Sequence, residues 1–236
     1  GVLRLESAVA AVDVPTILLL YALMIISAQL RLGGFYTRAA LRIVRLLHRP
    51  RWFLAASMAT AAVLSALLAN DIVCLAFTPV LVRAVQRAGR SPLPFLLGLA
   101  AASNIGSAAT IIGNPQNMLI GQVGRLDFAA FAAWCLPPTL LSLAAAFAIL
   151  CRIYRDDFSR PPESAAPGAP LEVDWPPFDP WQSAKGLAAT VLLVALFLTP
   201  WPREIVAVAV AGSLLCSRRM TSRSLLGLVD WHLITL

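Results

Sequence analysis

The sequence predicts an all-α polytopic membrane protein, and three observations carry that fold class. Apolar residues make up 59% of the 236 residues and charged residues only 13%, whereas soluble domains average about 45–50% and about 25%. Several charge-poor stretches approach the roughly 20 residues that a helix needs to cross the hydrocarbon core. The arginines gather between these stretches in a one-sided pattern. These observations exclude a soluble globular domain.

The charge-poor stretches give the expected helices in chain order. The spans are 14–30, 91–123, 128–151, 186–200 and 204–217, with a further apolar segment beginning near 228. The last two spans are short, and Pro200-Trp201-Pro202 forms a natural turn between them. The middle of 91–123 is polar and glycine-rich, so we expect this helix to be broken.

Residues 52–82 are expected to form a re-entrant helical hairpin with Asn70-Asp71 at its tip. Six arginines precede the segment between residues 31 and 51, and three follow it between 83 and 90. A crossing segment would put one of these clusters outside, against the positive-inside rule. The second arm, eleven residues from Ile72, is also too short to span.

With the hairpin returning to the inner side, all but three of the basic residues lie inside. The chain has 19 Lys and Arg and a net charge of +7, and the exceptions are Arg4, Arg125 and Arg203. This asymmetry predicts an integral protein of a prokaryotic cytoplasmic (inner) membrane. The one-sided placement of Lys and Arg at the membrane surface accounts for the positive net charge. We therefore expect membrane lipid as a partner and no nucleic acid.

Two short stretches read alike and predict an inverted repeat. Val12-Asp13-Val14 precedes the first apolar helix, and Val229-Asp230-Trp231 precedes the last apolar segment. In this orientation Asp13 lies outside and Asp230 inside, so the same start enters the membrane from opposite faces. The alternative is a chance match. The repeat predicts that the chain covers about half of a longer protein.

Asn70-Asp71 is the first polar break in the apolar pattern. An aspartate near the bilayer centre costs about 2.5–3.5 kcal/mol on insertion scales, and such residues usually face a cavity and have a function. The alternative is that Asp71 is only the solvated end of a hairpin. The first arm is 18 residues long and reaches deep into the membrane, so we favour a functional site.

Residues 103–117 form the second break. Gly106, Gly113 and Pro115 are expected to interrupt the helix, which would offer free carbonyls to a small cation and N-terminal amides to an anion. A small-residue packing face is the alternative for Gly106. The candidate substrate- or ion-binding residues of both breaks are Asn70, Asp71, Ser103, Asn104, Gly106, Ser107, Thr110, Gly113, Asn114 and Asn117.

The pairing of Leu68-Ala69-Asn70-Asp71-Ile72 with the Ser103–Asn117 stretch resembles the ion transporter superfamily, in its arsenite-efflux and citrate-transporter-like (anion permease) branch. The resemblance implies an inverted-repeat secondary transporter with a re-entrant hairpin and a broken helix, working by an elevator mechanism as a homodimer. It implies no cofactor, a coupling ion that is H⁺ or Na⁺, and no metal site other than sodium at the same loop. Superfamily symporters carry a neutral Ser-Asn-Thr at the hairpin, so the acid at Asp71 weakens a sodium–dicarboxylate assignment.

The same resemblance divides the chain into four parts. Residues 156–184 hold seven prolines and half of the acidic residues, which is typical of a cytoplasmic linker. The expected organisation is an N-terminal scaffold segment 1–51 with the first helix, a transport-domain half 52–155, the linker 156–184, and the start of a second half 185–236.

The predicted function is secondary active transport of a small anion or oxyanion-like solute, of the arsenite or citrate/dicarboxylate class, coupled to proton or sodium. A sodium/proton antiporter of the same superfamily is the main alternative. A membrane-embedded enzyme is a remote one, because Ser103 or Ser107 with Asp71 lacks a histidine or lysine partner. We therefore expect no enzyme activity. A scaffold or sensor with a degenerate site is a further alternative.

Overall fold

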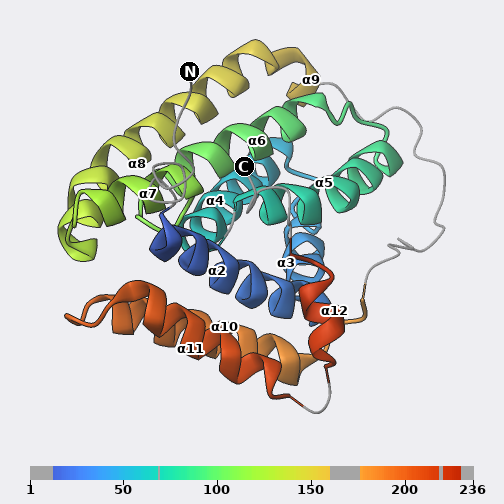
Figure 1. Cartoon of the computed structure of the whole chain (residues 1–236). Coiled ribbons are helices and arrows are strands. Elements are labelled where there is room, and N and C mark those ends of the chain that lie inside the picture. Colours follow the sequence, from blue (N-terminus) through green and yellow to red (C-terminus); the bar gives the residue numbers. More distant parts are fainter. Residues whose placement is uncertain (1–12, 69, 160–175, 218–219, 230–236) are drawn as a thin grey trace, which may run out of the picture.

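The structure is a computed structural model that describes residues 13–68, 70–159, 176–217 and 220–229 (Figure 1). No strand occurs among these residues, which confirms the all-α class. The helices are α2 (Val14–Leu32), α3 (Phe35–Val44), α4 (Pro50–Leu67), α5 (Asn70–Arg87), α6 (Leu93–Ser107), α7 (Pro115–Val123), α8 (Phe128–Ile153), α9 (Arg155–Ser159), α10 (Pro180–Phe197), α11 (Arg203–Leu215) and α12 (Ser222–Leu226).

Four of these helices, α2, α4, α8 and α10, are long and apolar enough to cross a membrane. Three of the four begin at an aspartate whose carboxylate accepts a backbone N–H of the first turn, a donor that would otherwise be unpaired. The pairs are Asp13 with Thr16 at 3.1 Å, Asp127 with Ala130 at 2.8 Å and Asp179 with Trp181 at 2.9 Å. Each start is therefore a polar cap followed directly by an apolar run.

α2 is the central helix. It is 67% buried over its most apolar stretch, against 11% for α8. Figure 1 shows α10 and α11 packed along one side of α2, with α3 to α8 on the other side. α2 is apolar all round, which is typical of a helix enclosed by other helices, and it joins the two groups in one core.

The hairpin differs from its prediction in the second arm. α5 has 18 residues, as many as α4, so the prediction of an arm too short to span was wrong. Pro79 does not end the helix, and the buried face continues through Val80, Leu81, Ala84 and Val85 up to Arg87. The arginines predicted an earlier end, but Arg83 lies on the exposed face of the continuing helix and Arg87 is its last residue.

The arginine-rich segment between the first helix and the hairpin contains an unpredicted helix, α3. Tyr36, Ala40 and Ile43 of α3 are buried at a spacing of three to four residues, while Arg38 and Arg42 are exposed. This pattern places an amphipathic helix against α5. The arginines between the apolar positions make this stripe hard to recognise in the sequence.

The expected linker 156–184 is helical at both ends. Residues 155–159 form α9, and α10 begins at Pro180, so the last five linker residues are the first turn of that helix. Residues 160–175 lie outside the described residues. The start of α10 is fixed to the end of α2, because Ser183 Oγ donates to the Gly33 carbonyl at 2.8 Å and Gln29 Nε2 donates to Gln182 Oε1 at 3.0 Å.

Contacts between helix ends join segments that the sequence places on the same side of the membrane. On the predicted inner side, Arg90 Nη1 donates to the Asp157 carbonyl at 3.1 Å. On the predicted outer side, Gln122 Nε2 donates to Glu204 Oε2 at 3.2 Å, and Arg203 donates to the Leu126 carbonyl. These contacts are compatible with the predicted orientation. The second copy of the repeat, from Asp230, lies outside the described residues and stays a prediction.

Candidate functional site

The tip of the hairpin lies against the last turns of α6, where the broken helix is interrupted. Ser103 Oγ donates to the Asn70 carbonyl at 3.1 Å, and Asn70 Nδ2 donates to Asn104 Oδ1 at 3.4 Å. The two polar breaks, 33 residues apart in sequence at their closest pair, are therefore one site in space. This adjacency is the central geometric feature of the candidate site.

Two further contacts from α4 fix this adjacency. Ser65 Oγ lies 2.8 Å from Ser103 Oγ, with both side chains almost fully buried at 0% and 1% exposure. Thr110 Oγ1 donates to the Ala66 carbonyl, one of the carbonyls left unpaired where α4 ends. Ser65 is not among the predicted site residues, because a lone serine in an apolar helix carries no signal of its own.

The break itself spans residues 108–114, between the end of α6 and the start of α7. Asn114 caps α7 by accepting the Asn117 N–H at 2.8 Å, and its Nδ2 donates to Ser107 Oγ at 3.2 Å and to the Ser107 carbonyl at 3.3 Å. Asn117 Nδ2 donates to the Ser107 carbonyl at 3.3 Å and to the Thr110 carbonyl at 3.0 Å. The two asparagine amides thus hold the break in a defined shape.

These contacts bear on the expectation that free carbonyls in the break are offered to a small cation. A carbonyl oxygen has two lone pairs, and the Ser107 carbonyl already accepts both asparagine amides. The Thr110 carbonyl accepts Asn117 Nδ2 and, at 3.4 Å, the Gly113 N–H. In this conformation a cation would have to displace an amide to reach either oxygen.

Gly106 does not interrupt the helix as predicted. It lies inside α6, and a Cβ there would stand 2.3 Å from Ala62 Cα of α4, so its role is the close packing given as its alternative. Gly113 does lie in the break, where a Cβ would stand 2.0 Å from the Ser107 carbonyl oxygen. Pro115 is the first residue of α7, a position where a missing N–H costs nothing.

The site residues separate into an open group and a buried group. Asp71 and Asn104 are exposed and Asn70 is half-buried, whereas Ser103, Ser107 and Gly113 are buried. The Asp71 carboxylate, in the first turn of α5, makes no hydrogen bond to another described residue. Asn70, Asp71 and Asn104 are therefore the groups that a ligand can reach.

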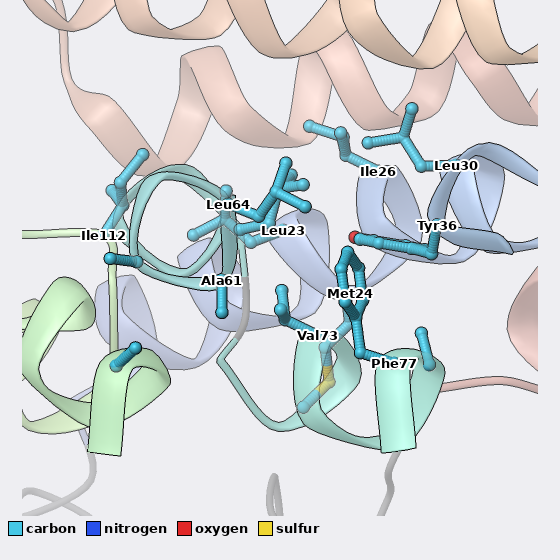
Figure 2. Close-up of a cluster of buried hydrophobic side chains, with 14 of the residues drawn as sticks. Leu23, Met24, Ile26, Leu30, Tyr36, Ala61, Leu64, Val73, Phe77 and Ile112 are labelled. Carbon is cyan, nitrogen blue, oxygen red and sulfur yellow. The ribbon is translucent and has the colours of Figure 1, made fainter. Parts of the chain in front are cut away.

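The break is anchored in the core by apolar side chains. Ile111 and Ile112 are both fully buried, and Figure 2 draws Ile112 in one cluster with Leu23 of α2 and Leu64 of α4. A pocket of about 260 Å³ between the end of α6 and α8 is lined by Ala108 of the break and by Thr139, among others. Within the described part of the chain, no three His, Cys, Asp or Glu residues gather as metal ligands would.

Comparison with known proteins extends over the whole chain. A family profile described as "Citrate transporter" matches residues 1–236. A silicon efflux transporter from Oryza sativa subsp. japonica is 29% identical over 174 residues, and the protein arsB of Dictyostelium discoideum is 26% identical over 157. A 46 kDa membrane protein of Mycobacterium leprae is 29% identical over 226 residues.

The matched regions cover much of this chain but less of its relatives. They include 72%, 66% and 94% of this chain, and 36%, 28% and 53% of the three relatives in the same order. The chain thus spans at most about half the length of these relatives. The resemblance inferred from the two polar breaks is confirmed by the family match.

Proposed function

The chain belongs to the citrate transporter family, and from that premise we propose that it supplies half of the binding site of a secondary active transporter. The proposed substrate is a small anion or oxyanion-like solute of the arsenite or citrate/dicarboxylate class. The observation that carries the proposal is the hydrogen-bonded contact between the hairpin tip and the broken helix, at Ser103 and Asn70. That contact leaves amide groups and one carboxylate open beside a rigid break.

The open groups suit a solute with several oxygen atoms. The amides of Asn70 and Asn104 each offer a donor and an acceptor, which fits hydroxyl or carboxylate oxygens. The Asp71 carboxylate opposes an anion at the same place, since like charges repel. Binding a proton or a sodium ion at Asp71 removes that repulsion, and this is how the solute and the coupling ion would be linked.

The hydrogen bonds already made by the Ser107 and Thr110 carbonyls affect which coupling ion we propose. Sodium prefers several oxygen ligands, but the Ser107 and Thr110 carbonyls already accept two amide donors each in this conformation. A proton needs only the Asp71 carboxylate. We therefore place the proton ahead of sodium as coupling ion, with sodium requiring the amides of Asn114 or Asn117 to move aside.

An elevator mechanism is part of the proposal. The hairpin and broken helix are joined by polar contacts at Ser65, Ser103 and Thr110, so they would move as one body. The central helix α2 with α10 and α11 would form part of the scaffold of a homodimer. The sodium/proton antiporter is the second candidate, because the exposed Asp71 suits an exchange of Na⁺ for H⁺ at one carboxylate.

The serine hydroxyls give no support to a membrane-embedded enzyme. Ser103 Oγ donates to the Asn70 carbonyl and Ser107 Oγ donates to the Asn104 carbonyl at 2.8 Å. Neither hydroxyl has a histidine or lysine partner among the described residues, so neither is set up as a nucleophile.

Proteoliposome transport tests the proposal. The protein, expressed from its full open reading frame, is compared with Asp71→Asn for pH- and sodium-driven movement of arsenite, citrate, succinate, sulfate and sodium. We expect the wild type to move one solute and Asp71→Asn to lose the ion dependence of that movement. Asp127→Asn is the matched control, because it makes the same change at a helix cap where asparagine serves as well as aspartate.

Each result has a separate meaning. Equal, ion-dependent solute movement by both proteins would remove Asp71 from the coupling. Sodium movement that requires no anion would select the antiporter. Folded protein that moves none of the solutes would contradict the proposed substrate class.

A further inference from the structure

A second pocket lies between α10 and α11, away from the candidate site. Its volume is about 410 Å³. Ala189, Val210 and Leu214 form its buried floor, while Ala188 and Leu192 are exposed at its rim. We call this pocket the α10–α11 groove. No residue of it takes part in the hairpin or the broken helix.

The groove follows one face of each helix. Lys185, Ala188, Ala189 and Leu192 are spaced at i, i+3, i+4 and i+7 on α10, which places them on a single stripe. Gly186, which packs on Leu30 of α2, lies on another face of α10. Figure 1 shows α10 and α11 as the outer layer beyond α2. The groove is therefore a lateral feature of this layer, lined by small and aliphatic side chains.

One end of the groove is positively charged. Lys185 Nζ donates to Ser217 Oγ at 3.2 Å and lies 5.6 Å from the centre of the Trp181 ring. No carboxylate among the described residues forms an ion pair with it. Within the described part of the chain its ammonium thus has neutral partners only, and it is available to an anion.

The position of this charged end matches a membrane interface. α10 is one of the four helices able to cross a membrane, and Lys185 follows its first residue by little more than one turn. Trp181 is 58% exposed beside it, as tryptophans at the headgroup level usually are. The charged end would therefore lie at headgroup depth and the apolar floor deeper in the hydrocarbon.

From this arrangement we propose that the α10–α11 groove binds one anionic phospholipid. The phosphate would accept hydrogen bonds from Lys185 and Ser217, and an acyl chain would lie along Ala188, Ala189 and Leu192. Basic pockets between membrane helices on the cytoplasmic side are suited to anionic headgroups. The apolar length of the groove requires a ligand with a chain, which a free phosphate lacks. This site is independent of the proposed transport function.

Lipid binding to the detergent-purified, full-length protein tests the proposal. Native mass spectrometry would compare phosphatidylglycerol, phosphatidylcholine with identical acyl chains, and glycerol 3-phosphate. We expect phosphatidylglycerol to bind most tightly, and Lys185→Gln to weaken its binding about fivefold. Arg223→Gln is the charge-matched control, because Arg223 is exposed on the same predicted side but does not line the groove.

A second variant tests the chain-binding part of the groove. Ala188→Leu fills the groove at an exposed position, so it should fold normally and reduce binding of both lipids without changing the net charge. Equal binding of the two lipids, equal weakening by Lys185→Gln and Arg223→Gln, or unchanged binding in Ala188→Leu would each overturn the proposal. Glycerol 3-phosphate binding as tightly as the lipid would also overturn it, in favour of a free-anion site.

Discussion

At the scale of single residues, two small residues set how closely the hairpin approaches the broken helix. Gly106 lets the backbones of α4 and α6 come together at Ala62. Ser65, fully buried, meets Ser103 in that same contact between helices. Neither residue can reach a ligand directly. They act on the site by fixing the position of Asn70 and the end of α6.

Gly106→Ala is expected to destabilise the protein by about 1–3 kcal/mol, because the added Cβ overlaps the α4 backbone and the helices must move apart. The measurement is the thermal unfolding midpoint of the purified protein. Gly212→Ala is the matched control, since no described atom apart from the adjacent backbone of its own helix lies within 4 Å of a Cβ at that α11 position. It should leave stability unchanged or raise it by up to about 1 kcal/mol. Equal effects of the two changes would contradict the packing role.

Ser65→Ala should lower stability by about 1 kcal/mol through the lost hydrogen bond, and should reduce solute movement in proteoliposomes. Ser57→Ala provides the comparison, because Ser57 is equally buried on the same helix but its hydroxyl has no hydrogen-bond partner among the described residues. That change should be neutral or slightly stabilising. If the order of the two effects were reversed, the Ser65–Ser103 bond would have no structural importance.

At the scale of elements, the break between α6 and α7 is an ordered structure. Ile111 and Ile112 fasten it to the core, and Asn114 and Asn117 bind its carbonyls from the side of α7. Non-helical backbone at membrane depth must have its polar groups paired within the protein. The asparagine amides supply this pairing, and they also decide how available the carbonyls are to an ion.

Asn117→Ala is expected to cost about 2 kcal/mol, since it removes the donors to the Ser107 and Thr110 carbonyls at about 1 kcal/mol each. Chemical unfolding would measure the loss. Gln116→Ala alters the neighbouring, exposed side chain and should change stability by less than about 0.5 kcal/mol. A loss of similar size in both variants would show that the amide of Asn117 does not maintain the break.

At the scale of the whole molecule, contacts at helix ends tie the first group of helices to the last. The end of α2 holds the start of α10 through Gly33 and Ser183, and the outer end of α7 holds α11 through Gln122 and Glu204. These contacts bridge large sequence separations and pair only ends that the charge pattern assigns to the same side. The predicted orientation, including the re-entrant hairpin, stays a prediction that labelling can test.

Cysteine labelling would test this orientation. In a background without the four native cysteines, His48→Cys and Gln86→Cys place exposed thiols near the two ends of the hairpin. Both should react with a membrane-impermeant reagent only from the inner side, and Thr199→Cys, exposed beyond α10, only from the outer side. Labelling of His48→Cys and Gln86→Cys from opposite sides would show that the segment crosses the membrane.

The sequence by itself determined the fold class, most helix positions and the two polar breaks. These features depend on local physics: apolar stretches define spans, and polar residues within an apolar run are rare enough to be noticed. The helix α3 and the full length of α5 were missed, because their apolar stripes are interrupted by arginines on the opposite face.

Only the tertiary structure decided which groups of the site are open and which are occupied. Ser65 belongs to the site because its hydroxyl contacts Ser103, 38 positions away in the sequence. Gly106 is a packing contact because Ala62 lies against it. The Ser107 carbonyl, expected to be free, is saturated by two side chains. Hydrogen-bond partners and close approaches depend on distances between segments, and a sequence pattern does not contain those distances.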